Sequence, residues 1–219
     1  RPMLNEDIVK AIDILRTWDY QVSVDSKAMS LAHYYLTTYR KSGKIPKGVR
    51  FPMEQVDYMT YQSEVAEKLE ILKASIEKLK ADFGSVEVPW GEINRYQRLN
   101  GAIQQKFDDD LPSTPVGMAS GYWGALASYG ARRSEGTKRI NGVAGNSFVA
   151  VVEFGEKVQA KTILAGGQSG DPKSSHFSDQ VERYVKPDFK KIAYYKDDVI
   201  SVAKERYAPG SRDNHNEEK

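Results

Sequence analysis

The chain lacks cysteine and has little histidine. None of its 219 residues is a cysteine, and the three histidines are His33, His176 and His215. A chain without thiols forms no disulfide framework, no thiolate metal site and no cysteine nucleophile. Because zinc sites draw mainly on cysteine and histidine ligands, a zinc site is not expected. The absence of thiols is compatible with any redox compartment.

The chain also lacks a long apolar run and an excess of charge of one sign. No apolar stretch is long enough to span a bilayer, so we predict a soluble protein without membrane insertion. The 32 basic and 30 acidic residues are interspersed and leave a formal net charge of +2, which does not predict nucleic-acid binding. Its composition, 40% hydrophobic and 28% charged, is that of a globular protein.

The N-terminal and C-terminal segments of the chain show no helix or strand periodicity. Arg1-Pro2-Met3-Leu4 shows no signal peptide and no initiating methionine, which we interpret as the start of a processed product or an engineered fragment. Residues 211–219 are polar throughout and are predicted to form a disordered tail. The chain is therefore predicted to be one incomplete domain, with a mainly helical segment over residues 1–85 and a sheet-rich segment over residues 86–210.

Helical periodicity dominates the first segment. We predict one helix over residues 5–16 with Asn5 as N-cap, and a second that begins at Asp25 or Ser26 and ends before Gly43. The longest stripe predicts a helix that Gly84 ends, and consists of Val65, Leu69, Leu72, Ile76, Leu79 and Phe83. We interpret this helix as lying on a larger body, with a helical interaction module as the alternative.

Glycines and β-branched residues become frequent after Val86, which predicts an α+β chain with a helical first half and an antiparallel sheet in its second half. Strands are predicted over residues 118–129, 148–154, 159–164 and 190–194. Gly155-Glu156-Lys157 predicts a hairpin between the second and third of these. Helices are predicted over residues 178–184 and 196–207.

Three groups of residues resemble active sites. Ser174, His176 and Asp179 have the residue types of a serine hydrolase triad, which remains an alternative. We favour a serine that caps a helix and a histidine bound to a loop, because triad members usually come from separate elements. Residues 166–170 (GGQSG) predict a tight backbone corner better than a phosphate loop. Residues 108–110 (DDD) predict a solvated acidic loop better than a cation site.

One aromatic and charged segment, residues 89–98, is interpreted as a structural clamp. Trp90 has a large apolar ring surface for packing. Glu92, Arg95 and Arg98 are expected to form buried or half-buried ion pairs.

Five motifs appear in order over residues 12–210, as in chains of the penicillin acylase family and its acyl-homoserine lactone acylase branch. They are L-x-x-W-D, W-G-x-x-x-R, G-x-S-[FY]-x-x-V-x-[DEF]-F, G-Q-S-x-x-P and S-x-H-[FY]-x-D-Q. The chain resembles the C-terminal part of the β chain in this family. Its motif positions, with an expected structural role, are Trp18, Asp19, Trp90, Gly91, Arg95, Gly145, Ser147, Gly167, Gln168, Ser169, Pro172, His176, Asp179 and Gln180.

The resemblance implies an N-terminal-nucleophile hydrolase with an αββα sandwich. In this family the first residue of the β chain, a serine, attacks the amide with its own α-amine as base. That serine and the oxyanion asparagine would precede Arg1, so the resemblance implies no catalytic residue here and an inactive isolated chain. It also implies an upstream β-chain portion and an α chain as partners, N-acyl substrates such as penicillins or acyl-homoserine lactones, and a periplasmic or secreted location. No cofactor or metal is expected on this chain, and calcium in the parent enzyme would be bound by residues outside it.

Overall fold

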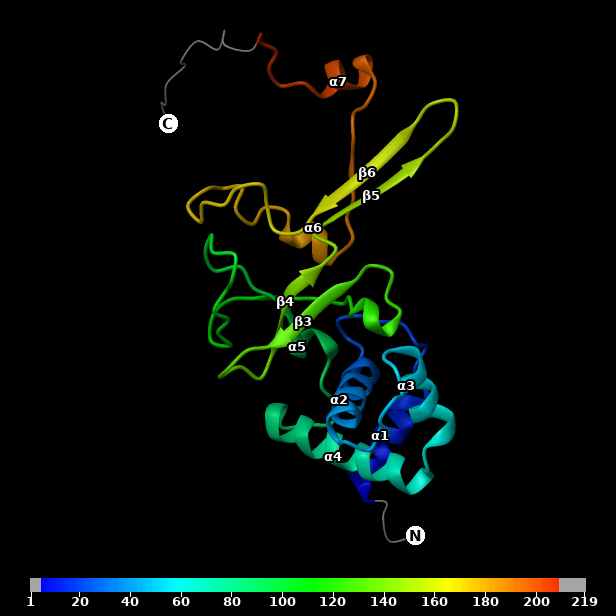
Figure 1. The fold of residues 1–219 in the computed structure, drawn as a ribbon. Coiled ribbons are helices and arrows are strands. Elements are labelled where there is room, and N and C mark those ends of the chain that lie inside the picture. Colours follow the sequence, from blue (N-terminus) through cyan, green and yellow to red (C-terminus); the bar gives the residue numbers. More distant parts are fainter. Residues whose placement is uncertain (1–4, 209–219) are drawn as a thin grey trace.

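The computed structural model describes residues 5–208, which form an α+β chain with two separate sheets. Figure 1 shows the N-terminal helices gathered at one end, a sheet in the middle, and a hairpin that projects toward the other end, where the last helix lies. The predicted α+β class is confirmed. The αββα sandwich stays a prediction, and the predicted tail over residues 211–219 lies outside the described residues.

Three helices with clear sequence signals form the helical end. They are α1 (Glu6–Arg16), α2 (Lys27–Lys41) and α4 (Val65–Phe83). The side chain of Asn5 accepts a hydrogen bond from the Ile8 amide at 2.9 Å, and Ser26 caps α2 in the same way. Gly84, with a φ of 79°, ends α4 in the left-handed conformation that glycine adopts without strain. All three predicted helices are confirmed.

Between α2 and α4 the chain forms two short helical turns that carry little periodicity. These are α3 (Met53–Asp57) and the π-helical segment η1 (Tyr58–Gln62). Their only buried residue is Met59, which packs with Tyr39 and Ile71 in a small cluster of its own.

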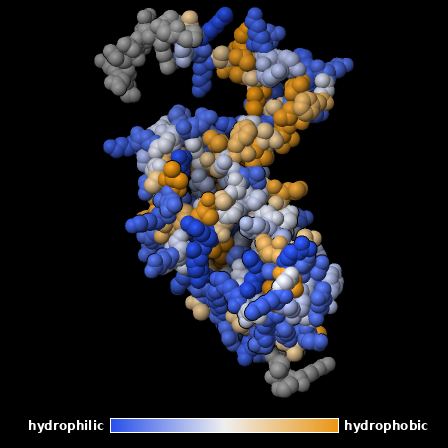
Figure 2. Space-filling model, in the orientation of Figure 1, coloured by the Kyte–Doolittle hydropathy of each residue, from blue (hydrophilic) through white to orange (hydrophobic). Residues whose placement is uncertain are grey.

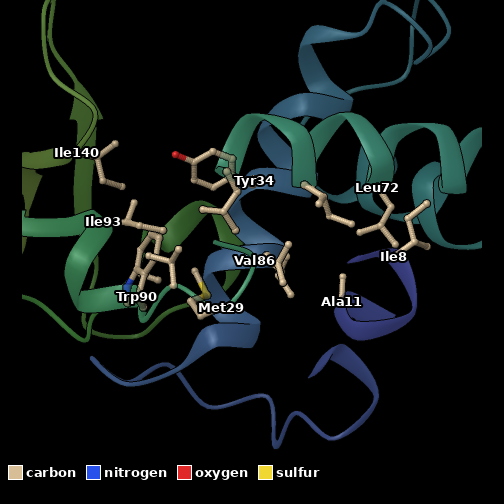
Figure 3. Packing of buried hydrophobic residues seen from close by; sticks show 14 residues of the cluster. Ile8, Ala11, Met29, Tyr34, Leu72, Val86, Trp90, Ile93 and Ile140 are labelled. Atoms are coloured by element: carbon tan, nitrogen blue, oxygen red, sulfur yellow. The ribbon is translucent and has the colours of Figure 1, made fainter. Parts of the chain in front are cut away.

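The main core lies between α1, α2, α4 and the segment that leads into the sheet. Figure 3 shows this cluster of 14 buried residues, which includes Leu31, Leu79 and Trp90. Three residues of the α4 stripe, Leu72, Ile76 and Leu79, are buried in it, so α4 lies on the body of its own chain as predicted. Because this face is already covered, the alternative of a helix that docks a partner loses its docking surface.

The four-stranded sheet follows α5 (Trp90–Ile93) and has the order β2-β1-β4-β3. Its strands are β1 (Asn94–Tyr96), β2 (Thr114–Pro115), β3 (Tyr129–Arg133) and β4 (Ile140–Gly145). β1 pairs with β4 in parallel, whereas the other pairs are antiparallel. A purely antiparallel second half was therefore a wrong prediction. β4 runs opposite to β3 in their hairpin, and the other edge of β4 pairs with β1, which runs in the same direction as β4.

The predicted strand over residues 118–129 is wrong. This segment holds only an isolated bridge from Ala119 to Ser128 and a 3-10 turn, η2 (Gly121–Trp123), before β3 begins at Tyr129. Ser120 caps the turn, and Gly124 closes it with a φ of 87°. The small residues and glycines that resemble a close-packed strand therefore form a tight turn instead.

The second sheet has the order β5-β6-β7 and is antiparallel. β5 (Phe148–Glu153) and β6 (Gln159–Leu164) form the predicted hairpin, and β7 (Lys190–Lys191) is shorter than predicted. The last helices, α6 (Val181–Val185) and α7 (Lys196–Val202), are also shorter than predicted. α6 begins only after Gln180, whose amide donates to the Gly166 carbonyl at 2.7 Å.

The hairpin is packed only at its base, where Ile163 of β6 is buried in a cluster with Tyr129 and Tyr184. Val151 and Val152 point to opposite faces of β5, yet they are 58% and 44% exposed, and Phe154 at its end is 85% exposed. Figure 2 shows apolar residues gathered on this projecting part of the molecule. No helix within residues 5–208 has the length and apolarity needed to cross a bilayer.

Candidate functional site

The chain makes a tight corner directly after β6. Gly166 has a φ of +80°, and a Cβ atom added to Gly167 would lie 2.1 Å from the carbonyl oxygen of His176. The loop over residues 174–179 therefore packs against the corner at a distance that only glycine permits. The predicted tight corner is confirmed.

Arg98 also binds this corner, through hydrogen bonds to backbone carbonyl groups. Its guanidinium donates to the carbonyl oxygens of Phe177 and Ser169, the latter at 2.9 Å, and lies 4.1 Å from the centre of the Phe177 ring. Carbonyl oxygens take the place of the carboxylate partner that was predicted.

Arg95 is likewise held by carbonyl oxygens and not by Glu92. Its guanidinium donates to Gly91 at 2.8 Å and to Ser113 at 2.6 Å. Glu92 instead lies 4.0 Å from Arg139. The predicted pairs of Glu92 with Arg95 and Arg98 are wrong, because both guanidiniums donate to backbone carbonyl groups of neighbouring segments instead.

The candidate triad is assembled only in part. His176 Nδ1 lies 2.9 Å from Asp179 Oδ2, and the hydrogen bond from His176 holds the pKa of the exposed Asp179 carboxyl below its usual range. Ser174 Oγ accepts a hydrogen bond from the backbone amide of His176 at 3.2 Å. Within residues 5–208 no hydrogen bond joins Ser174 to the imidazole. The geometry therefore does not give Ser174 a base.

The favoured interpretation of these serines also needs a correction. α6 begins after Gln180 and has no side-chain cap, so neither Ser174 nor Ser178 caps it. The Ser174 hydroxyl instead closes a local turn with the His176 amide.

A cleft of about 700 Å³ lies between this corner and the four-stranded sheet. Tyr96, Tyr129 and Tyr184 line it, together with Arg98 and the β4 segment Gly142–Gly145. The Tyr129 hydroxyl donates to the Arg95 carbonyl and that of Tyr184 to the Asn146 carbonyl, both at 2.7 Å. Burial raises the pKa of Tyr184 to about 12 and also raises that of Tyr129, so both phenols are neutral at pH 7. The cleft therefore offers polar surface but no ionised tyrosine.

The motif positions fall in three places. The cleft is lined by Gly145, Ser147 and Gly167. The adjoining loop carries Ser169, His176, Asp179 and Gln180, and on the same loop Gln168 and Pro172 are exposed to solvent. Trp90, which donates from Nε1 to the Met118 carbonyl at 3.0 Å, lies with Gly91 and Arg95 at the start of the four-stranded sheet. Trp18 and Asp19 form the turn after α1, where both bond to the backbone of Gln21.

Two buried asparagines beside these motifs were missed in the sequence. Asn94 donates to the carbonyls of Val116 and Met118 at 2.9 and 2.8 Å, and Asn141 is 2% exposed on β4. Their side-chain oxygens have no partner among the described residues. The sequence gives only a polar residue at the start of one short strand and another within β4, and periodicity does not indicate that either is buried.

The acidic residues do not form a cation site. Within residues 5–208 no group of three histidine, aspartate or glutamate residues could hold a metal ion. The prediction of a solvated acidic loop is wrong for Asp109. Its carboxylate accepts hydrogen bonds from the backbone amides of Lys138 and Arg139 at 2.6 and 3.3 Å.

A sequence model of the penicillin amidase family matches residues 2–201. The chain belongs to the penicillin amidase family. The resemblance carried by the five motifs is confirmed, and family membership supports a penicillin acylase-like hydrolase. Within the matched region the described geometry brings together a corner, a cleft and a positioned arginine, but not a nucleophile with its base.

Proposed function

We propose that this chain forms the C-terminal part of the β chain of a penicillin acylase-like amidohydrolase. It supplies sheet and helical cover to a nucleophile-bearing portion and does not hydrolyse amides alone. The observation that carries the proposal is the uncovered β5–β6 hairpin, whose two faces both expose apolar side chains.

Exposed apolar faces of this kind mark a surface that another segment covers. Phe148, Val151 and Val152 lie on both faces of β5 and are 60%, 58% and 44% exposed. A strand buried on both faces is typical of an inner layer of a sandwich, because helices or a second sheet then cover each side. The hairpin therefore has the side chains of an inner strand pair without the layers that would cover it.

β4 offers an open edge next to this hairpin. Its pairing with β1 reaches only Asn141, so Ala144 and Gly145 pair with β3 on one side alone. This edge lies along the cleft, which Gly142–Gly145 line. An additional strand from the upstream portion would pair with this edge and close the cleft.

In the assembled enzyme the chemistry would belong to the upstream portion. An N-terminal serine attacks the amide carbonyl, and its α-amine, with a pKa of about 7.7–8.0, accepts the proton. The substrates in this proposal are linear amides such as penicillins, acyl-homoserine lactones or other N-acyl compounds, and the location is periplasmic or secreted. This chain positions strands and contributes no catalytic residue.

Hydrolysis of a chromogenic N-acyl anilide tests the proposal. The 219-residue chain alone should be inactive, and activity should appear when the chain is co-expressed with the upstream β portion and the α chain of its precursor. Hydrolysis by the chain alone that is lost in Ser174→Ala would overturn the proposal in favour of the serine hydrolase. A failure of the chain to associate with its precursor portions would also overturn it.

A further inference from the structure

The sheet of β5, β6 and β7 has one protected edge and one open edge. β7 forms the first edge with only Lys190 and Lys191, and short edge strands that carry lysine resist further pairing. β5 forms the other edge with six residues, FVAVVE, and neither proline, lysine nor a bulge interrupts it. Among residues 5–208 no strand pairs with the outer side of β5. The open edge for a further strand is therefore that of β5.

Backbone hydrogen bonds show which residues of β5 face the open edge. The amide of Ala165 donates to the carbonyl of Ser147 at 2.8 Å, so Ser147 faces β6. The carbonyl of Ala160, which lies opposite Val152, accepts from the Ile192 amide at 2.9 Å on the side of β6 that carries β7. Backbone groups alternate between the two sides of an antiparallel strand. The groups that face outward therefore belong to Phe148, Ala150 and Val152.

The open edge runs from Ser147 to Glu153. It begins after Asn146, because the amide of Asn146 already donates to the carbonyl of Ser128 at 2.9 Å. It ends at Glu153, the last residue of β5. The midpoint of this edge is Ala150, which is one of the outward-facing residues. An antiparallel pair with Ala150 opposite the same residue of a second copy therefore uses the whole edge of both copies.

The charges of the strand fit this pairing of two copies. Glu153 is the only charged residue of β5. When the pair is centred on Ala150, Glu153 lies opposite Ser147 of the second copy, so no like charges lie opposite one another. The pairing also uses the open edge of each copy and leaves the lysines of β7 at both outer edges of the joined sheet. The contact is therefore closed, as in a dimer, and does not propagate into a fibre.

We propose that the β5 edge binds a second copy of this chain, as an antiparallel pair of β5 strands about a two-fold axis at Ala150. Figure 1 shows the hairpin that carries this edge projecting beyond the four-stranded sheet. A hairpin of two strands is marginally stable in water, and β7 adds only two residues to it, so a second hairpin completes the sheet. The proposed function concerns the exposed faces of the hairpin, whereas this pairing concerns its edge, so neither depends on the other.

Sedimentation equilibrium of the 219-residue chain, from about 1 to 200 μM, tests the proposal and should show a monomer in equilibrium with a dimer. Ala150→Pro should weaken the dimer about tenfold or more, because it removes the two central hydrogen bonds of the pair. It breaks no bond to β6, since the amide of Ala150 faces outward. Ala150→Ser keeps this amide and is the matched control, which should dimerise like the unchanged chain. Circular dichroism compares the folds of the two variants.

Oxidative cross-linking with copper phenanthroline gives a second measurement that does not depend on proline. The chain has no cysteine, so Ala150→Cys introduces its only thiol. Residues opposite one another in a hydrogen-bonded pair have Cα atoms about 5.5 Å apart, which is within the range of a disulfide. Ala150→Cys should therefore form a covalent dimer. Gln159→Cys is the matched control, because Gln159 is also exposed but lies on β6, one strand further from the second copy.

Four results would each overturn the proposal. They are a monomer at every concentration, assembly beyond a dimer, a dimer that Ala150→Pro does not weaken, and equal cross-linking of Ala150→Cys and Gln159→Cys. A dimer that resists the proline would show that the exposed faces, and not the edge, hold the copies together. If Ala150→Pro changed the circular dichroism spectrum, the cross-linking comparison would decide.

Discussion

The two ends of this molecule carry apolar residues in opposite ways. At the helical end, Leu31, Leu79 and Trp90 are almost wholly buried, and the α4 stripe faces α1 and α2. At the other end, the β5–β6 hairpin has complete backbone pairing but exposes Val151, Val152 and Phe154. The difference teaches that the helical end completes its own core, whereas the hairpin packs only at its base, where Ile163 is buried, and leaves apolar side chains uncovered beyond it.

The largest expected effect tests the helical end. Leu79→Ala removes a side chain with 0% exposure and should lower the free energy of unfolding by about 3–4 kcal/mol, from lost burial and the remaining cavity. Urea denaturation followed by circular dichroism measures it. Val65→Ala on the same helix is the control, because Val65 is 69% exposed and its loss should change stability by less than about 0.5 kcal/mol. Equal effects would contradict a self-sufficient helical core.

The corner at the base of the hairpin should be nearly as sensitive. Gly167→Ala places a methyl group 2.1 Å from the His176 carbonyl oxygen, so the loop must move, at a cost of about 1–3 kcal/mol. Gly170→Ala is the matched control, since nothing lies within 4 Å of its added methyl group. Denaturation measures stability, and limited proteolysis should show faster cleavage within residues 166–180 only in Gly167→Ala. If Gly167→Ala left stability and proteolysis unchanged, the loop over residues 174–179 would not pack against Gly167.

The joint between the helical end and the sheet should depend on pH. Although burial opposes it, hydrogen bonds from Arg133 and Tyr34 hold the pKa of Asp82 below its usual range. A lowered folded-state pKa stabilises the fold above the unfolded pKa of about 3.9, and this stabilisation is lost as pH falls through the folded value.

Asp82→Asn should therefore cost about 1–2 kcal/mol at pH 7, and its deficit should shrink below pH 4. Asp13→Asn breaks an exposed pair with Arg16 and should cost less than about 0.5 kcal/mol. Denaturation at several pH values compares the variants, and a deficit of Asp82→Asn that persists at low pH would show that the pair does not hold the joint.

The same contrast explains how much could be predicted from the sequence. The helices over 6–16, 27–41 and 65–83 have caps and a 3.6-residue period, and the hairpin has β-branched strands around a glycine turn, so local signals were sufficient. The parallel pair of β1 with β4 joins Asn94 to Ile140, which no local pattern reports. Arg98 was assigned a carboxylate because sequence shows charges but not the carbonyl oxygens that loops leave unpaired.

The smallest expected effect on stability tests the hairpin. Val152→Ser changes a side chain that is 44% exposed, in a strand without a covering layer, and should alter the unfolding free energy of this chain by less than about 0.5 kcal/mol. Its effect should appear in assembly instead. If the upstream portion covers this face, replacing Val152 by serine removes apolar contact with that portion. Reconstitution of this variant with the precursor portions should then yield less complex and less amide hydrolysis at equal concentration.

Lys157→Ser at the hairpin turn is the control for this experiment, because it changes a residue outside the paired strands that lies over the Tyr195 ring. Size-exclusion chromatography of the reconstituted mixture measures the complex, and the ratio of the two variants decides between the explanations. A hairpin whose exposed valines served no covering layer would give equal yields for Val152→Ser and Lys157→Ser. Lower yield with Val152→Ser alone would show that the packed and the unpacked end differ because one of them is completed by another polypeptide segment.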